Sequence, residues 1–151
     1  MTTQDFIASY NKTFDYIEDR YGTEMLQKLW KKISDHWCVH FEDCIRRDGL
    51  DGCVEYWGGD AGTLEREQAG CKIAMKDGVF SIIMERCPSV DEVRSRGQEP
   101  HVGKLTYCDH CAALYPPILA KYGLKMTIET FYHPDGRCVG RCNNYIIKES
   151  K

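Results

Sequence analysis

The spacing of apolar residues changes near residue 70, and this change constrains the fold more than any other feature of the sequence. Before it, apolar side chains recur every three or four residues, as one face of a helix requires. After it, short apolar runs are separated by turn-forming residues, as in antiparallel strands. The sequence therefore predicts a helical region followed by a sheet.

Two long helices are predicted in the first half of the chain. Apolar residues over 6–17 form one stripe, which Gly22 ends. A second stripe runs over 26–44, and the polar sequence that closes with Gly49 ends it. A third, weaker helical segment covers 64–69. Together these segments predict that the chain is mainly helical up to residue 70.

Two strand pairs are predicted in the second half. In each pair, two apolar runs flank a turn: 71–76 and 79–86 around Asp77-Gly78, then 124–132 and 137–147 around Pro134-Asp135-Gly136. An Asp-Gly dipeptide between such runs is a strong signal for a two-residue hairpin turn. Each pair should therefore be antiparallel.

A connection and a helix join the two strand pairs. We expect residues 88–100 to be a polar, charged connection. We expect 105–122 to be a helix that Gly123 ends. Pro116-Pro117 should break this helix, because proline lacks the N–H that the helix interior needs.

The predicted fold class is α+β, with a helical N-terminal half followed by a β-β-α-β-β antiparallel sheet. We expect a single domain over residues 1–151, because a chain of 151 residues can bury one core. Residues 1–70 should be mainly helical. Residues 71–148 should form the strand-strand-helix-strand-strand unit.

Composition limits the compartment and the partners. The net charge of −3 argues against nucleic acid or an anionic membrane surface as a partner. No apolar run reaches the roughly 18 residues that span a bilayer, and the first residues are polar and acidic, unlike a signal peptide. We therefore expect a cytoplasmic protein with a small-molecule substrate, no nucleic acid and no membrane partner. Its apolar helical half could support a homodimer.

Cysteine is the residue type that points to chemistry. The chain has 9 cysteines, and cytoplasmic thiols stay reduced, so core residues, ligands or a nucleophile fit better than disulfides. The densest group is Tyr107-Cys108-Asp109-His110-Cys111. Cys108 would lie in the first helical turn, where free N–H groups and the helix dipole stabilise a thiolate. Cys111 would follow one turn later on the same face.

Histidines near these thiols could move protons. His110 could accept a proton in the cysteine-rich segment, while Asp109 could simply serve the helix N-terminus. In the helical half, His36, His40 and Cys44 lie four residues apart along one side of the predicted helix. They could share a metal ion, although no glutamate completes H-E-x-x-H. If they line a pocket instead, His40 is the best general acid or base there.

A metal site is an alternative use of the thiols. Cys87 ends the first strand pair, while Cys138 and Cys142 lie four apart on the last strand and therefore face the same side. With Cys108 and Cys111 they could ligate zinc, which takes four ligands in a structural site and three in a catalytic one. Cysteine is also a common inert core residue. The residues alone leave these uses open.

Four short motifs carry a family resemblance: Cys87-Pro88, Tyr107-Cys108-Asp109-His110-Cys111, Gly123, and Gly136-Arg137-Cys138. Through them, residues 87–142 resemble the L-2-amino-thiazoline-4-carboxylic acid hydrolase-like family. The resemblance implies a small cytoplasmic α+β protein that opens a cyclic, amidine-like C–N bond with a cysteine nucleophile. The chain departs from the expected pattern at Cys111, where we expect an acidic residue. A second thiol at that position favours a metal or redox site.

The leading hypothesis is a small-molecule hydrolase that acts on a cyclic or amidine-type C–N bond. Cys108 would attack as a thiolate, and His110 or His40 would move protons. Cys87, Asp109 and Tyr107 would belong to the pocket. This chemistry requires no cofactor.

The alternative hypothesis is a module without catalysis. It would bind zinc or an iron–sulfur cluster through Cys87, Cys108, Cys111 and Cys138, with Cys142 as a further candidate ligand. It could also act as a thiol sensor. A redox exchanger of the thioredoxin type is weaker, because no parallel βαβ pattern surrounds the C-x-x-C sequence.

Overall fold

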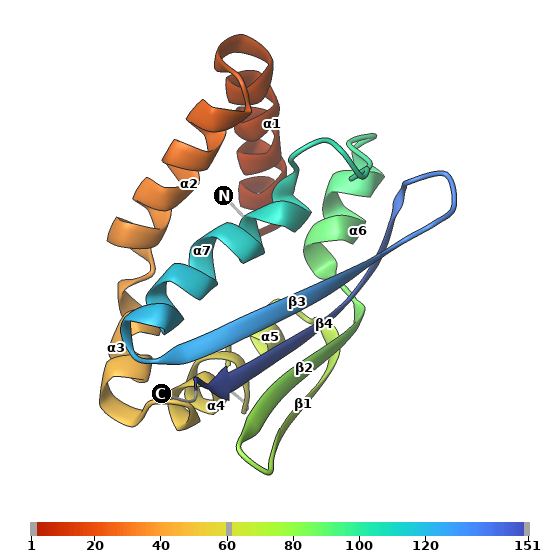
Figure 1. Ribbon diagram of the computed structural model, residues 1–151. Coiled ribbons are helices and arrows are strands. Elements are labelled where there is room, and N and C mark those ends of the chain that lie inside the picture. The colour runs from red at the N-terminus through yellow and green to blue at the C-terminus, as the bar shows by residue number, and fades with distance from the viewer. Residues whose placement is uncertain (1–2, 60–61, 150–151) are drawn as a thin grey trace.

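The structure is a computed structural model that describes residues 3–59 and 62–149. A helical N-terminal half precedes a four-stranded antiparallel sheet, and the two strand pairs are separated by helices. The predicted α+β class is confirmed. Figure 1 shows the helices gathered on one side of the sheet.

The N-terminal half is built from short and medium helices. In the described residues these are α1 (Thr3–Tyr21), α2 (Thr23–Trp37), α3 (Val39–Asp48), α4 (Asp51–Trp57) and α5 (Thr63–Arg66). The first predicted stripe corresponds to α1 and ends before Gly22. The segment predicted over 64–69 corresponds to α5, which is shorter.

The helix predicted over 26–44 is two helices. The chain leaves the helical conformation at Cys38, with φ −87° and ψ 27°. Trp30 of α2 is buried with one core cluster, whereas Phe41 of α3 is buried with another. The break therefore lets one apolar stripe serve two separate clusters. The structure also forms α4, which the sequence did not predict.

The second half contains the four predicted strands and two helices. Their bounds are β1 (Gly70–Lys76), β2 (Val79–Arg86), α6 (Pro88–Ser95), α7 (Tyr107–Lys121), β3 (Leu124–Tyr132) and β4 (Cys138–Lys148). The strand bounds agree closely with the predictions. The two hairpin turns also lie where the Asp-Gly sequences indicate.

Part of the predicted connection over 88–100 is a helix. Cys87 is the N-cap of α6, and Pro88 occupies its first turn, where a missing N–H costs nothing. Val90 and Val93 of this helix are buried. Two buried valines are enough to hold a short helix against the core, but too few to give a periodic signal.

The predicted break in α7 does not occur, because the helix continues through Pro116 and Pro117. The two prolines remove the N–H partners of the Ala112 and Ala113 carbonyls. Packing compensates for the lost hydrogen bonds, because α7 contacts α2 and β3 and its residues Ile118 and Leu119 are fully buried.

The strand order in the sheet is β1-β2-β4-β3, with every neighbouring pair antiparallel. The last strand in sequence is therefore central, between β2 and β3. In its register, Val79 lies opposite Ile147 and Met84 lies opposite Cys142. This insertion brings the cysteines of β4 beneath α7, which lies along the sheet in Figure 1.

Two apolar clusters stabilise the fold, and α7 contributes to both. Phe14, Leu26 and Trp30 form the smaller one, against which Tyr107 at the start of α7 packs. The larger one lies between the sheet and helices α3, α4 and α7, and includes Leu119 near the end of α7. Helix α7 thus positions its N-terminal turn between the helical half and the sheet.

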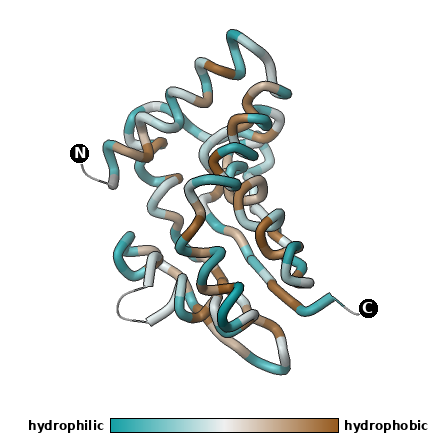
Figure 2. The backbone as a smooth tube through the Cα atoms, turned by 90° about the vertical axis from the view of Figure 1, so that its left-hand side faces the viewer, coloured by the Kyte–Doolittle hydropathy of each residue, from teal (hydrophilic) through white to brown (hydrophobic). Residues whose placement is uncertain are grey.

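Apolar residues are distributed in short stretches along the chain. Figure 2 shows these stretches interrupted by hydrophilic residues in the helices as well as the strands. Among the residues that the structure describes, no helix has the length and hydropathy to cross a bilayer.

Candidate functional site

A cavity of about 150 Å³ lies between the sheet and the N-terminal turns of α6 and α7. Its wall is mainly carbon and sulfur. Large apolar side chains in it come from α4, α7, β2 and β3: Trp57, Tyr115, Ile82, Met84, Met126 and Ile128. The five cysteines from 87 onward also line it. The residue before α6, helix α7 and strand β4 thus bring these five cysteines to one cavity.

The start of α7 is fixed by a capping box. The Thr106 hydroxyl accepts a hydrogen bond from the Cys108 N–H at 3.2 Å and donates one to the Asp109 carboxylate at 2.9 Å. The same carboxylate accepts the Thr106 N–H at 2.8 Å. These bonds satisfy N–H groups that a helix start otherwise leaves free. Asp109 therefore serves the helix and is not part of the cavity wall.

A second set of contacts ties this turn to α1. The buried Asn11 side chain accepts a hydrogen bond from the Tyr107 N–H at 2.9 Å and donates one to Gln98 at 2.8 Å. One amide thus links α1, the segment before α7 and α7 itself. The Cys108 side chain is held by a rigid turn.

Cys108 and Cys138 meet across the cavity end nearest the β3–β4 turn. Their sulfur atoms are 3.8 Å apart, although the residues lie on α7 and β4. Cys138 is fully buried and Cys108 is partly buried. Both residues line the cavity.

The contact between the two sulfur atoms shifts the pKa values of the two thiols in opposite directions. The hydrogen bond from Cys108 lowers the pKa of Cys138 to about 7, against the opposing effect of burial. The Gly140 N–H, 3.4 Å from the Cys138 sulfur, and the Arg94 guanidinium also stabilise its thiolate. The same contact, together with burial, raises the pKa of Cys108. When the pair loses one proton, the Cys108 thiol therefore donates to a Cys138 thiolate.

This arrangement differs from the predicted nucleophile. We expected the helix N-terminus to stabilise a thiolate at Cys108. In the structure, the N–H of Cys108 is bonded to Thr106 and the Asp109 carboxylate occupies the same turn. The negative charge is better accommodated at Cys138, which has its own N–H donor and a nearby cation.

The other three cysteines that line the cavity are Cys87, Cys111 and Cys142. Burial raises the pKa of Cys87 to about 11 and raises the pKa values of Cys111 and Cys142. Cys142 accepts a hydrogen bond from the Asn144 amide at 3.4 Å, which only partly offsets burial. These cysteines are therefore protonated at neutral pH.

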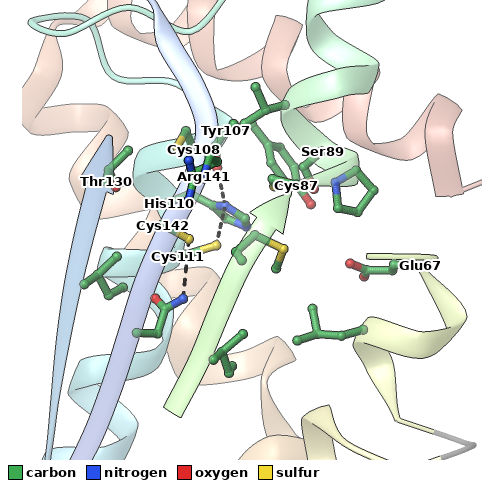
Figure 3. A pocket seen from close by; sticks show the side chains of 18 of the residues that line it. Glu67, Cys87, Ser89, Tyr107, Cys108, His110, Cys111, Thr130, Arg141 and Cys142 are labelled. Atoms are coloured by element: carbon green, nitrogen blue, oxygen red, sulfur yellow. Dashed lines mark hydrogen bonds between the residues drawn. The ribbon is translucent and has the colours of Figure 1, made fainter. Parts of the chain in front are cut away.

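His110 is a neutral side chain in the cavity wall. Only 7% of it is exposed, and burial lowers its pKa to about 4. Its Nδ1–H donates to the Tyr107 carbonyl at 2.8 Å, so Nε2 carries the lone pair. Within the described part of the chain, Nε2 has no hydrogen-bond partner. Figure 3 shows the His110 ring beside Cys111 and Cys142, with Glu67 on the opposite side.

The structure does not bring every predicted residue to the site. His40 is exposed on α3 beside the Tyr56 ring, with the ring centroids 5.7 Å apart, and does not line the cavity. The break at Cys38 also separates it from His36, which is on α2. Cys87, Tyr107, His110 and Cys111 do line the cavity.

The metal-site prediction is wrong. Among residues 3–59 and 62–149, no group of three or more His, Cys, Asp or Glu side chains could hold a metal ion. Geometry explains this result, because Cys138 and Cys142 are four residue steps apart on one strand, which separates them by roughly 13 Å. Zinc ligands must all lie about 2.3 Å from one point. The expected zinc or iron–sulfur site on Cys87, Cys108, Cys111, Cys138 and Cys142 is therefore not formed.

Two charged residues at the site had no sequence signal. Arg94 lies beside Cys138 and donates to its carbonyl at 2.7 Å, but it belongs to the segment predicted as a connection. Glu67 lines the cavity, and burial raises the pKa of its carboxyl group. The local sequence around each residue would predict a charged side chain at the protein surface. Only the tertiary fold places them.

No family model matches the chain, and no curated protein matches it. Among solved structures, the chain is similar to a trafficking protein particle complex subunit 3 from Naegleria fowleri, covalently bound to palmitic acid. The TM-score is 0.48 and the sequence identity is 11%, over 97% of this chain and 95% of that chain. The resemblance to the L-2-amino-thiazoline-4-carboxylic acid hydrolase-like family stays a prediction.

The similar solved structure is described as a subunit of a trafficking particle complex. This description corrects the expected partner, a small-molecule substrate. The hydrolase hypothesis stays a prediction.

Proposed function

We propose that the chain is a thiol sensor without catalytic turnover, in which Cys108 and Cys138 are reversibly oxidised to a disulfide. The observation that carries the proposal is the 3.8 Å contact between their sulfur atoms. A disulfide bond is about 2 Å long, so a small closing movement would complete it. The two residues come from different elements, and the bond would join α7 covalently to the central strand.

The acidity of the pair supports the same function. A thiolate is the form of cysteine that reacts with oxidants. Cys138, with its pKa near 7, is about half ionised at neutral pH. Cys108 carries the proton and is in position to resolve the oxidised partner. One thiolate and one adjacent thiol are the two components that a redox-sensing pair needs.

The reaction balances with a peroxide as the oxidant. The Cys138 sulfur attacks one peroxide oxygen, the O–O bond breaks, and the leaving oxygen takes a proton to become water or an alcohol. Cys138 is then a sulfenic acid. The Cys108 sulfur attacks it, an S–S bond forms, the S–O bond breaks, and water leaves with the thiol proton. Two thiols supply the two electrons, and no cofactor takes part.

The proposed setting is the cytoplasm. There the glutathione and thioredoxin systems keep thiols reduced, and protein disulfides are mostly transient. A pair that begins as two free thiols and returns to them after oxidation fits that setting. The nine cysteines of the structure are all free.

Disulfide mapping tests the proposal. Fully reduced protein is treated with excess hydrogen peroxide, quenched with an alkylating agent, and digested for mass spectrometry. We expect a Cys108–Cys138 disulfide that dithiothreitol removes. Cys138→Ser should abolish it, since serine is not oxidised in this way.

The matched control is Cys142→Ser. This cysteine lies four residues further along β4 and lines the same cavity, but its thiol is protonated. The variant should form the Cys108–Cys138 disulfide as readily as the native chain. Irreversible oxidation of Cys138 to a sulfinic acid, or a disulfide between other pairs, would refute the sensor.

A further inference from the structure

The route to the sensing pair runs through the cavity. None of the Cys138 surface is exposed to solvent, so an oxidant cannot reach its sulfur from the open surface. Cys138 does line the cavity, together with Cys108. Whatever oxidises this pair must therefore fit the cavity. The cavity wall then determines which oxidants react.

The composition of the wall favours an apolar oxidant. Ile82, Met126 and Ile128 cover one side of the cavity, and Trp57 and Tyr115 lie across from the strands. Burying apolar surface against such a wall is favourable, whereas a small polar molecule would lose its hydrogen bonds with water. A fully polar peroxide has little to gain from entering.

The volume of the cavity limits the size of the oxidant that can enter. Its volume is about 150 Å³. An apolar cavity of roughly that volume stays dry and holds one benzene molecule. A compact hydrocarbon group of a few carbon atoms therefore fits, and a long acyl chain does not fit within this volume.

The wall also offers a partner for a hydroperoxide proton. Nε2 of His110 carries a lone pair and has no hydrogen-bond partner among the described residues. A hydroperoxide has one O–H group, and it could donate to this nitrogen while the hydrocarbon group contacts the apolar wall. An ether or a hydrocarbon of equal size would lack that interaction.

We infer that the oxidant sensed by Cys138 and Cys108 is a compact organic hydroperoxide, held by the apolar cavity wall and by His110. The inference rests on the proposed sensor function and names its oxidant class. The Cys138 sulfur attacks the terminal oxygen of R–O–OH, and the O–O bond breaks. The alkoxide leaves and takes a proton as the alcohol R–OH. Cys108 then resolves the sulfenic acid and releases water, as for any peroxide.

A comparison of two oxidants tests this inference. Reduced protein is mixed with tert-butyl hydroperoxide or with hydrogen peroxide at equal concentration, and the Cys108–Cys138 disulfide is followed by quenching and peptide mapping. We expect disulfide formation to be at least about tenfold faster with tert-butyl hydroperoxide, because its hydrocarbon group is buried. Accessible thiols in the unfolded protein should show no such preference.

A matched pair of variants tests whether the cavity causes the preference for tert-butyl hydroperoxide. Ile128 lies in the cavity wall on the edge strand β3, and the neighbouring Thr127 is exposed on the other face of that strand. Ile128→Trp should fill the cavity and remove the preference for tert-butyl hydroperoxide. Thr127→Trp places the same side chain outside and should leave the preference intact.

The possible outcomes distinguish a failure of the inferred oxidant from a failure of the proposed sensor function. A Cys108–Cys138 disulfide that forms equally fast or faster with hydrogen peroxide overturns the inferred oxidant and leaves the sensor standing. The same holds if Thr127→Trp alters the preference as much as Ile128→Trp does. If neither oxidant produces the Cys108–Cys138 disulfide, the sensor and its oxidant both fail.

Discussion

Cys138 and Cys87 line the same cavity, but their thiols differ in acidity. Cys138 is fully buried, yet its pKa is lowered to about 7. Cys87 is partly exposed, and its pKa is raised to about 11. Burial alone would give both thiols a raised pKa. Both sulfurs receive hydrogen bonds, from Val90 and Ser89 at Cys87 and from Cys108 and Gly140 at Cys138, but only at Cys138 do these bonds outweigh burial.

Cys138 receives the donors that a thiolate needs. The Cys108 thiol and the Gly140 N–H point at its sulfur, and Arg94 lies nearby. Cys111 has Cys87 and Cys142 as neighbours, and Cys142 has Cys138 and Cys71, whose charges would repel a thiolate. Gathering thiols in one cavity therefore does not make them reactive. The contact with the Cys108 thiol, which is the largest effect on the pKa of Cys138, distinguishes this cysteine from the others.

The largest test of this contrast is the relative alkylation of Cys138 and Cys87. At pH 7 the thiolate fraction should favour Cys138 by more than a thousandfold, partly offset by the lower nucleophilicity of an acidic thiolate. We expect a net preference of about 100-fold for Cys138. Iodoacetamide labelling of native reduced protein, followed by peptide mapping, measures it.

Solvent exposure alone would give the reverse order, since Cys87 is partly exposed and Cys138 is not. The native chain in denaturant is the control, because both thiols then have ordinary pKa values and should label alike. Faster labelling of Cys87 in the native state would show that access, and not acidity, governs these thiols.

The second test concerns the charge of His110, which lies beside Cys111. A protonated His110 would stabilise a Cys111 thiolate and weaken the contrast. Its folded pKa of about 4 lies below that of an unfolded histidine, so the unfolded chain binds its proton first as the pH falls. Stability should therefore be present above pH 6.5 and be lost on acidification, by about 2 kcal/mol between pH 7 and pH 5.

Urea unfolding at the two pH values measures this loss. His110→Asn removes the titrating group and should remove most of the difference. His40→Asn, at an exposed histidine on α3, should retain it. Equal pH dependence in the native chain and in His110→Asn would mean that His110 is not the buried neutral group described here.

Local patterns were sufficient to predict most of the fold. Asp77-Gly78 defines the first hairpin because turn and strands are adjacent in sequence. The break at Cys38 was missed because the apolar spacing continues across it without a change of phase. Helix α6 was missed because only Val90 and Val93 mark its buried face. The central position of β4 depends on pairing with β2 across more than fifty residues, which no local pattern records.

The site was predicted in its location but not in its pairing. The C-x-x-C sequence at Cys108 and Cys111 directed attention to α7, and Cys138 was recognised as a neighbour. The contact that matters joins Cys108 to Cys138, 30 residues apart. The helix-dipole argument predicted a thiolate at Cys108, because the sequence does not show that Arg94 and the Gly140 N–H lie beside Cys138.

The smallest test removes only the donor at Cys108. Cys108→Ala deletes the hydrogen bond to Cys138, so the pKa of Cys138 should rise from about 7 toward that of an ordinary thiol, with Gly140 and Arg94 preventing a full return. Its labelling by iodoacetamide at pH 7 should slow about tenfold, and the half-maximal rate should move to higher pH. Cys108→Ser keeps an O–H donor at the same place and should leave the profile near that of the native chain. If alanine and serine shift the profile equally, packing around residue 108 sets the acidity of Cys138, and the difference between Cys138 and Cys87 needs another cause.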